Sequence, residues 1–175
     1  HAKGMEASTV ATRMKAAGYK TAYFGKYLNQ YGSAKFAPPS YVPPGWDEWY
    51  GLASTIKYYD YRLNENGTVV NYGSQPSDYA TDVLGRKAQS VLTTLLNGSQ
   101  PFFVMLSPFA PHVTTLRDED EGSRLMATPA PRHENLYPGL KAPRSPSYNE
   151  ADVSEKPMMI QRLPSVTLLT PIGPC

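Results

Sequence analysis

The sequence predicts an α/β domain with a mainly parallel sheet. Twice along the chain, a segment with helical spacing of apolar residues is followed by a short apolar segment: residues 8–17 precede residues 21–25, and residues 78–96 precede residues 101–107. Helices that alternate with strands are typical of α/β domains. The second apolar segment, PFFVMLS, is continuous, which is typical of a strand buried on both faces of a parallel sheet.

The first helix is expected to begin at Ser8 or Thr9, either of which can cap it, and to end before Gly18. Its expected apolar face consists of Val10, Met14 and Ala17. The strand that follows, TAYFG at residues 21–25, ends directly before Lys26. A helix, a tight glycine turn and a strand make up half of an α/β unit.

The middle of the chain predicts a loop, a hairpin and a second helix. Residues 32–50 are rich in proline and aromatic residues, which favours an irregular loop. Residues 55–73 alternate aromatic or apolar residues with polar ones, and residues 64–67, NENG, can turn the chain into a β-hairpin. The second helix is expected from Asp78 to Asn97-Gly98. Its expected apolar face consists of Tyr79, Val83, Ala88, Val91, Leu92 and Leu95.

Beyond residue 108 the periodic patterns weaken. Residues 117–124, RDEDEGSR, are interpreted as a solvated loop, because neighbouring carboxylates on an extended chain point in different directions. Residues 127–157 are rich in proline and predict a loop, and residues 158–175 have no clear place in the fold.

Composition excludes several kinds of partner and suggests a compartment. The net charge of +2 gives no electrostatic case for nucleic acid or a membrane surface, and no apolar run approaches the roughly 20 residues that span a bilayer. The only cysteine is Cys175, so a disulfide within the chain is excluded. Two sequons, at Asn66 and Asn97, are compatible with a secreted or lysosomal glycoprotein, and both also fit simple Asn-Gly turns.

Two chemically useful side chains follow the two predicted strands. Lys26 follows the first strand directly, and His112 lies a few residues beyond the second. Ligands of open parallel sheets bind beyond the carboxyl ends of the strands, where an ammonium and an imidazole would suit an anionic substrate. The alternative for each is structural: Lys26 as a solvated loop residue, and His112 as a structural histidine of a proline-rich loop.

Several motifs resemble those of the sulfatase family, in the family's order and spacing. GYKTAYFGK at residues 18–26 resembles the second sulfatase signature, and PFFVMLSPFAPH at residues 101–112 resembles a later family strand with its histidine-bearing loop. Other stretches resemble the arylsulfatases closest to N-acetylglucosamine-6-sulfatase: GKYLNQY, PPGWDEWYGL, YYDYRLNENG, YATDVLGRKA and the stretch that begins APRHENLYPG. The resemblance covers about residues 4–157.

The resemblance implies part of an alkaline-phosphatase-like α/β domain over residues 1–157, followed by a divergent tail over 158–175. It also implies hydrolysis of sulfate esters of aryl or sugar substrates, with a formylglycine nucleophile and a calcium ion. In the family, Lys26 would contact the sulfate, and His112 would contact the sulfate or the leaving oxygen. Asn29, in a GKYLN run where many sulfatases have GKWH, would help to line the pocket.

The chain departs from the family pattern because it lacks the motif of the catalytic nucleophile. No C-x-P-x-R or S-x-P-x-R sequence occurs, and Cys175 has no residues after it. The family's calcium ligands are expected outside this stretch, so the chain by itself is expected to be inactive. Two alternatives stay open: a non-catalytic module that binds sulfated glycans or regulates an intact partner, and a phosphoester hydrolase of the same superfamily.

Overall fold

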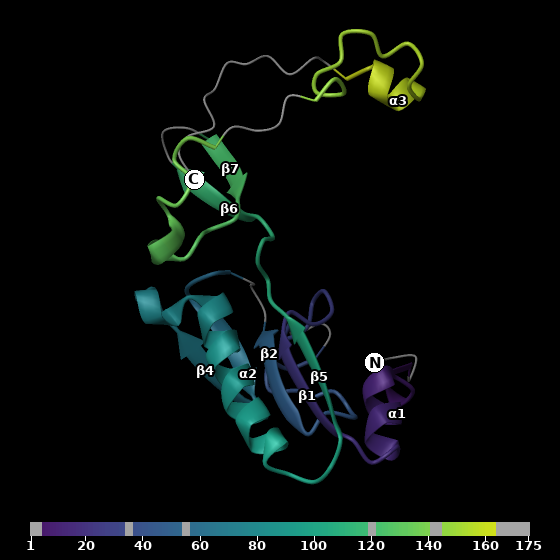
Figure 1. Ribbon diagram of the computed structural model, residues 1–175, viewed down its shortest axis with the longest axis vertical. Helices are drawn as coiled ribbons and strands as arrows, with labels where there is room; N and C mark the ends of the chain where they lie inside the picture. The colour runs from purple at the N-terminus through teal and green to yellow at the C-terminus, as the bar shows by residue number, and fades with distance from the viewer. Residues whose placement is uncertain (1–4, 34–36, 54–56, 119–121, 141–144, 164–175) are drawn as a thin grey trace. The chain divides into compact units, whose positions relative to one another are not determined.

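The computed structural model describes residues 5–33, 37–53, 57–118, 122–140 and 145–163 (Figure 1). The chain divides into two compact units, His1–Thr128 and Pro129–Cys175, which are described separately. The first unit contains the predicted strands and both predicted helices, and it therefore positions the candidate site.

A five-stranded sheet forms the centre of the first unit. Its strands are β1 (Lys20–Gly25), β2 (Glu48–Ala53), β3 (Tyr61–Glu65), β4 (Thr68–Tyr72) and β5 (Phe102–Ser107), in the order β4-β3-β2-β1-β5. β1 pairs parallel with both β2 and β5, whereas β3 pairs antiparallel with β2 and β4. The α/β prediction is confirmed, and the antiparallel part arises because the predicted hairpin joins the same sheet.

β1 is the buried central strand that TAYFG predicts. Its Thr21, Ala22, Tyr23, Phe24 and Gly25 are all buried. Successive side chains of a strand point to opposite faces, so Tyr23 packs on one face of the sheet and Phe24 on the other. Phe24 stacks on Tyr50 of β2, with ring centroids 5.0 Å apart.

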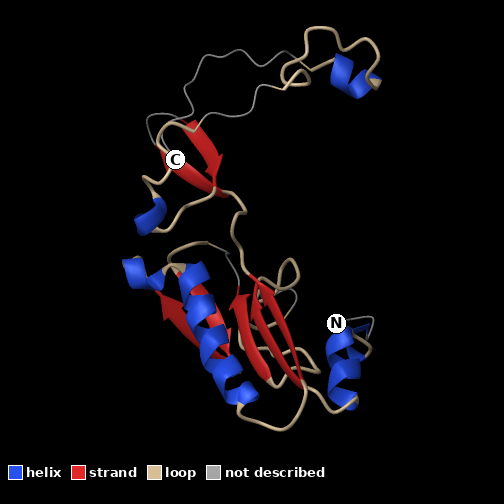
Figure 2. Cartoon of the chain, in the orientation of Figure 1, coloured by secondary structure: helices blue, strands red, loops and turns tan. Residues whose placement is uncertain are grey.

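Helix α2 (Ala80–Leu96) covers the Phe24 face of the sheet (Figure 2). A short 3-10 helix, η2 (Pro76–Asp78), precedes it, so α2 begins two residues after the predicted start at Asp78. It ends at Leu96, directly before the expected end at Asn97, which caps it. Its buried side chains are Ala80, Val83, Leu84 and Ala88. Their spacings of three, one and four residues place them on one stripe of the helix, which faces the sheet.

The Tyr23 face carries an aromatic cluster. Tyr23 stacks on Trp49 at 4.6 Å, and Trp46 and Tyr31 pack around the same indole. The Trp49 indole N–H donates to the Tyr31 hydroxyl (2.7 Å), which also accepts from the Asn64 amide (2.9 Å). Trp49 and Tyr31 thus keep their buried polar atoms paired.

Helix α1 (Val10–Ala16) follows a 3-10 turn, η1 (Met5–Ala7), and packs on this cluster. Thr9 caps it, and Gly18 follows it with φ of +88°, as predicted. The predicted apolar face is wrong: Val10 is 54% exposed and Ala17 is exposed, whereas Ala11 is buried. The small side chain of Ala11 lets the helix approach Trp46 and Trp49 closely.

Three predictions about strands are corrected. β2 begins within the predicted loop of residues 32–50 and continues beyond it, and its pairing with β1 and β3 outweighs the low strand propensity of Gly51. β5 lies at the edge of the sheet, so it is not buried on both faces: Phe102, Met105 and Leu106 are 36–52% exposed. Finally, the strands β6 (Thr114–Asp118) and β7 (Gly122–Met126) pair antiparallel where residues 117–124 predict a loop.

The second unit has little regular structure in its described residues. It contains the 3-10 helix η3 (Pro131–His133) and the four-residue helix α3 (Met158–Gln161), the latter within the predicted tail. The boundary expected at residue 157 stays a prediction. None of the helices in the described ranges is long and apolar enough to cross a membrane.

Candidate functional site

The candidate site lies at the carboxyl ends of β1 and β5. These parallel strands pair in register, with Gly25 opposite Ser107. The Lys26 amide donates to the Ser107 carbonyl (2.8 Å), which extends the pairing by one residue. Gly25 has φ of +119°, and a Cβ atom there would lie 1.8 Å from the Ser107 oxygen. Only glycine therefore allows β1 to turn into Lys26 at this distance from β5.

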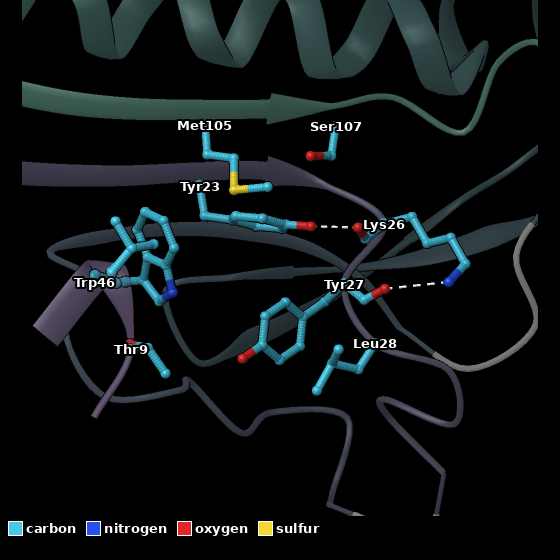
Figure 3. A pocket seen from close by; sticks show the side chains of 10 residues that line it. Thr9, Tyr23, Lys26, Tyr27, Leu28, Trp46, Met105 and Ser107 are labelled. Atoms are coloured by element: carbon cyan, nitrogen blue, oxygen red, sulfur yellow. Dashed lines mark hydrogen bonds between the residues drawn. The ribbon is translucent and has the colours of Figure 1, made fainter. Parts of the chain in front are cut away.

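The Lys26 ammonium is held by neutral oxygen atoms. It donates to the Tyr27 carbonyl (3.1 Å; Figure 3) and also to Oδ1 of Asn29 (2.8 Å). Within the described ranges, no carboxylate lies at ion-pair distance from it. An ammonium has three N–H donors, so one donor and the full positive charge remain for an anion.

Asn29 contacts the lysine, and its place in a substrate pocket stays a prediction. Its side chain is exposed, and its amide oxygen accepts the bond from the Lys26 ammonium. A cavity of about 240 Å³ does lie beside Lys26, between the start of α1 and the end of β1. It is lined by Thr9, Val10, Ala11, Tyr23, Lys26, Tyr27, Leu28, Trp46, Met105 and Ser107. Most of these side chains are apolar or aromatic, and Lys26 is the one charged residue among the described residues that line the cavity.

His112 lies in the loop that follows β5. Its ring stacks on Phe109 with centroids 4.9 Å apart, and its amide donates to the Phe109 carbonyl (2.9 Å). Nδ1 lies 2.8 Å from the carbonyl of Val113, which can only accept, so Nδ1 must carry the proton of that bond. Nε2 is then the nitrogen that can receive or donate a proton to a ligand.

Lys26 and His112 are brought to the same end of neighbouring strands, as their positions predict. They share neither a hydrogen bond nor the cavity, which His112 does not line. The neighbours that position them were not predicted as site residues. Tyr23 and Ser107 lie three and five residues before Lys26 and His112, and a high density of tyrosine surrounds Lys26. Tyr58 lies 54 residues before His112, so it had no local signal.

The described residues do not fit a calcium site. No group of three or more histidine, cysteine, aspartate or glutamate side chains gathers anywhere in the described ranges. Calcium takes six to eight oxygen ligands, so no step is assigned to a metal on this chain.

The two sequons are both on the surface but differ in their contacts. Asn66 is exposed in the turn between β3 and β4, with φ of +52°. Its amide oxygen accepts from the Trp49 amide (2.6 Å), and its amide nitrogen donates to Glu48 (2.8 Å). Asn97 is exposed at the carboxyl end of α2.

Comparison with known proteins relates the chain to sulfatases. A family model described as Sulfatase matches residues 2–152. A putative extracellular sulfatase Sulf-1 homolog of Caenorhabditis elegans is 33% identical over 160 residues, which are 90% of this chain and 20% of that protein. N-acetylglucosamine-6-sulfatase of Capra hircus is 38% identical over 133 residues, which are 75% of this chain and 22% of that protein.

A solved structure agrees with these relatives. It is described as BT4656 in complex with its substrate D-glucosamine-2-N,6-O-disulfate, with a TM-score of 0.54 and 27% identity. The similarity covers 78% of this chain and 23% of that one. The chain thus spans about a fifth of the length of the curated relatives it matches. Because the family model matches most of its residues, the chain belongs to the sulfatase family.

Proposed function

We propose that this chain carries two sulfate contacts, Lys26 and His112, of a sulfuric ester hydrolase that acts on sulfated sugars. The observation that carries the proposal is the Lys26 ammonium, which lies beyond a buried parallel strand with neutral oxygen atoms as its described partners. Support for a sugar substrate comes from the relatives, one named as an N-acetylglucosamine-6-sulfatase and one solved with a sulfated glucosamine.

The chemistry divides between the two side chains. The ammonium of Lys26 is a compact charge that can hold a sulfate oxygen through its third N–H. The imidazole of His112, with its Nδ1 proton directed to the Val113 carbonyl, can offer Nε2 to the sulfate or to the leaving oxygen. Charge that develops on the leaving oxygen is stabilised when such donors are already in place.

Binding without turnover is the function we propose for the chain by itself. The printed sequence contains no C-x-P-x-R or S-x-P-x-R motif, and the described residues do not gather a metal site. With calcium and an aryl sulfate, we therefore expect no hydrolysis. Hydrolysis that is lost in Lys26→Ala would contradict this part of the proposal.

The binding proposal can be tested by NMR titration of the whole chain. N-acetylglucosamine 6-sulfate is added to the ¹⁵N-labelled protein, and N-acetylglucosamine serves as the uncharged control. We expect the sulfated sugar alone to shift the signals of Lys26 and His112. Lys26→Met should weaken binding by roughly ten-fold, because one charge-assisted hydrogen bond is lost.

Lys20→Met is the matched control. Lys20 is exposed at the opposite end of the same strand, so its loss removes an equal charge without touching the candidate site. Equal weakening in both variants would show a nonspecific effect of net charge, and absence of any sulfate-dependent shift would refute the site. Binding of an aryl sulfate in preference to the sugar would favour an arylsulfatase.

We also propose that the protein is secreted or lysosomal, with glycans at Asn66 and Asn97. Both side chains are exposed, and one relative is named as an extracellular sulfatase. After secretion from a eukaryotic host, the mass of the protein should fall on treatment with a glycan amidase. Asn66→Gln and Asn97→Gln should each remove one glycan; a secreted wild-type chain without added mass would contradict the assignment.

The domain boundary stays part of the proposal. We place a partial sulfatase catalytic domain at residues 1–157 and the divergent tail at 158–175. The family model ends at residue 152, which is compatible with that boundary. Removal of residues 158–175 should leave the NMR signals of β1 and β5 unchanged, and loss of those signals would refute it.

A further inference from the structure

Each of the two candidate site residues has its main-chain carbonyl bound by a buried tyrosine hydroxyl. The Tyr23 hydroxyl donates to the carbonyl of Lys26, and the Tyr58 hydroxyl donates to the carbonyl of His112 (2.7 Å). Both tyrosines are only 2% exposed. The two come from different parts of the sequence, one within β1 and one between β2 and β3.

The bond from Tyr23 completes the fixation of the Lys26 backbone. The Lys26 amide already donates to the Ser107 carbonyl of β5 (2.8 Å), so both of its main-chain polar groups are bound. Tyr23 itself is held by its stack on Trp49, at 4.6 Å with 17° between the rings (Figure 3 shows the bond to Lys26). The Lys26 backbone, from which the side chain extends, is therefore held in place although Lys26 lies outside β1.

The bond from Tyr58 does the same for His112. The His112 amide donates to the Phe109 carbonyl (2.9 Å), and its carbonyl accepts from Tyr58. Tyr58 is packed between Phe109 and Tyr79, with ring centroids 5.2 Å and 5.6 Å away. Phe109 thus contacts both the imidazole of His112 and the ring of Tyr58, whose hydroxyl binds the His112 carbonyl.

We propose that Tyr23 and Tyr58 are positioning residues that hold Lys26 and His112 in place for an anionic group of the substrate. The assignment rests on the function proposed for those two residues. Neither tyrosine touches the ligand; each acts through the backbone of the residue that does. A site that depends on charges at loop positions needs such fixation, because misplacement by about 1 Å can cost much of the benefit.

Burial keeps both hydroxyls as donors. It raises the pKa of Tyr23 to about 12, and it raises the pKa of Tyr58 above its ordinary value. Both remain protonated at neutral and acidic pH, so neither places a negative charge near a sulfate.

The test compares three conservative variants of the whole chain. Tyr23→Phe and Tyr58→Phe each remove one hydroxyl and leave the ring in its stack. Tyr79→Phe is the control: Tyr79 stacks on Tyr58 and is buried, but its hydroxyl donates to the carbonyl of Thr128, away from the two candidate residues. Thermal unfolding of all three variants measures the stability that is lost when a buried tyrosine hydroxyl is removed.

The first measurement needs no ligand. Amide hydrogen exchange of Lys26 should be about five-fold faster in Tyr23→Phe, and that of His112 about five-fold faster in Tyr58→Phe, as expected for one lost hydrogen bond. Tyr79→Phe should leave both rates within two-fold of wild type. Unchanged exchange in the first two variants overturns the proposal, whatever the chain binds.

The second measurement is the affinity for N-acetylglucosamine 6-sulfate. We expect Tyr23→Phe and Tyr58→Phe to bind three- to ten-fold more weakly, and Tyr79→Phe to bind like wild type even when it is equally destabilised. Equal weakening in all three would overturn the positioning role. A wild type that does not bind the sugar would instead refute the function proposed for Lys26 and His112, and the exchange rates would still decide whether the tyrosines hold them.

Discussion

The turn from β1 into the candidate site should be intolerant of any side chain at Gly25. In Gly25→Ala, the backbone keeps φ of +119°, a region that costs a residue with a Cβ about 1–3 kcal/mol. The new Cβ would also lie 1.8 Å from the Ser107 oxygen and 2.4 Å from its carbon, so β1 and β5 must separate locally.

Separation breaks at least the bond from the Lys26 amide to Ser107, worth about 1 kcal/mol. Together these terms give a loss of about 2–4 kcal/mol in the free energy of unfolding, a large share of the total for a small domain. The assay is urea unfolding of the whole chain, followed by the fluorescence of Trp46 and Trp49, both of which lie in the core.

Variants at two other glycines separate the cost of a positive φ from the cost of the clash with Ser107. Gly18 has φ of +88° and nothing within 4 Å of the added Cβ, so Gly18→Ala should cost only about 1 kcal/mol. Gly85 lies within α2 with open space around it, so Gly85→Ala should stabilise by about 0.5–1 kcal/mol. A loss in Gly25→Ala no larger than that in Gly18→Ala would refute the steric reasoning.

Three further predictions concern the core and the sheet edge. Asn64→Ala should lower the free energy of unfolding by about 3 kcal/mol, because the buried Asn64 amide group forms hydrogen bonds with the Tyr31 hydroxyl, the Tyr41 carbonyl and the Gly67 amide. A free energy of unfolding within about 1 kcal/mol of wild type, measured with denaturant, would contradict this prediction. The free energy of unfolding should fall as pH rises from 10 to 12, because the pKa of Tyr23 is about 12 in the folded protein and lower in the unfolded chain, which then loses the proton first. The urea midpoint should decline less over this range in Tyr23→Phe than in wild type. Equal declines would refute the raised pKa of Tyr23. Along β5, the carbonyls of residues 101 and 107 accept bonds from the Lys20 and Lys26 amides, so the main-chain N–H groups of residues 103 and 105 point to β1. The amides of 103 and 105 should therefore exchange slowly, and those of 102, 104 and 106 should exchange fast. Uniform protection along β5 would show that its outer edge is covered.

The exposed edge at β5 also bears on how the chain behaves alone. Phe102, Met105 and Leu106 are partly exposed on a strand that, in the described residues, pairs on one side only. Such a strand is prone to pair with other chains. The continuous run PFFVMLS therefore predicts an aggregation-prone segment, and its position in the sheet agrees with that prediction.

The sequence by itself determined the local features of this protein. The two helices, the buried TAYFG strand and the hairpin at residues 61–72 depend mainly on neighbours a few positions away, and each is found within a few residues of its predicted place. The apolar face predicted for the first helix is wrong, because Val10 and Ala17 are exposed. The positions of Lys26 and His112 after two strands also follow from local patterns, because strand ends can be recognised from apolar runs.

Only the tertiary structure decided what depends on contacts between distant segments. β2 forms because β1 and β3 pair with it, although its first residues, 48–50, lie in a segment whose composition predicts a loop. β5 lies at an edge although its composition is that of a buried strand. Tyr58 reaches the backbone of His112, which lies 54 residues away along the chain. Such contacts arise from long-range packing, which no local periodicity records, so the supports of the site appear only in the folded protein.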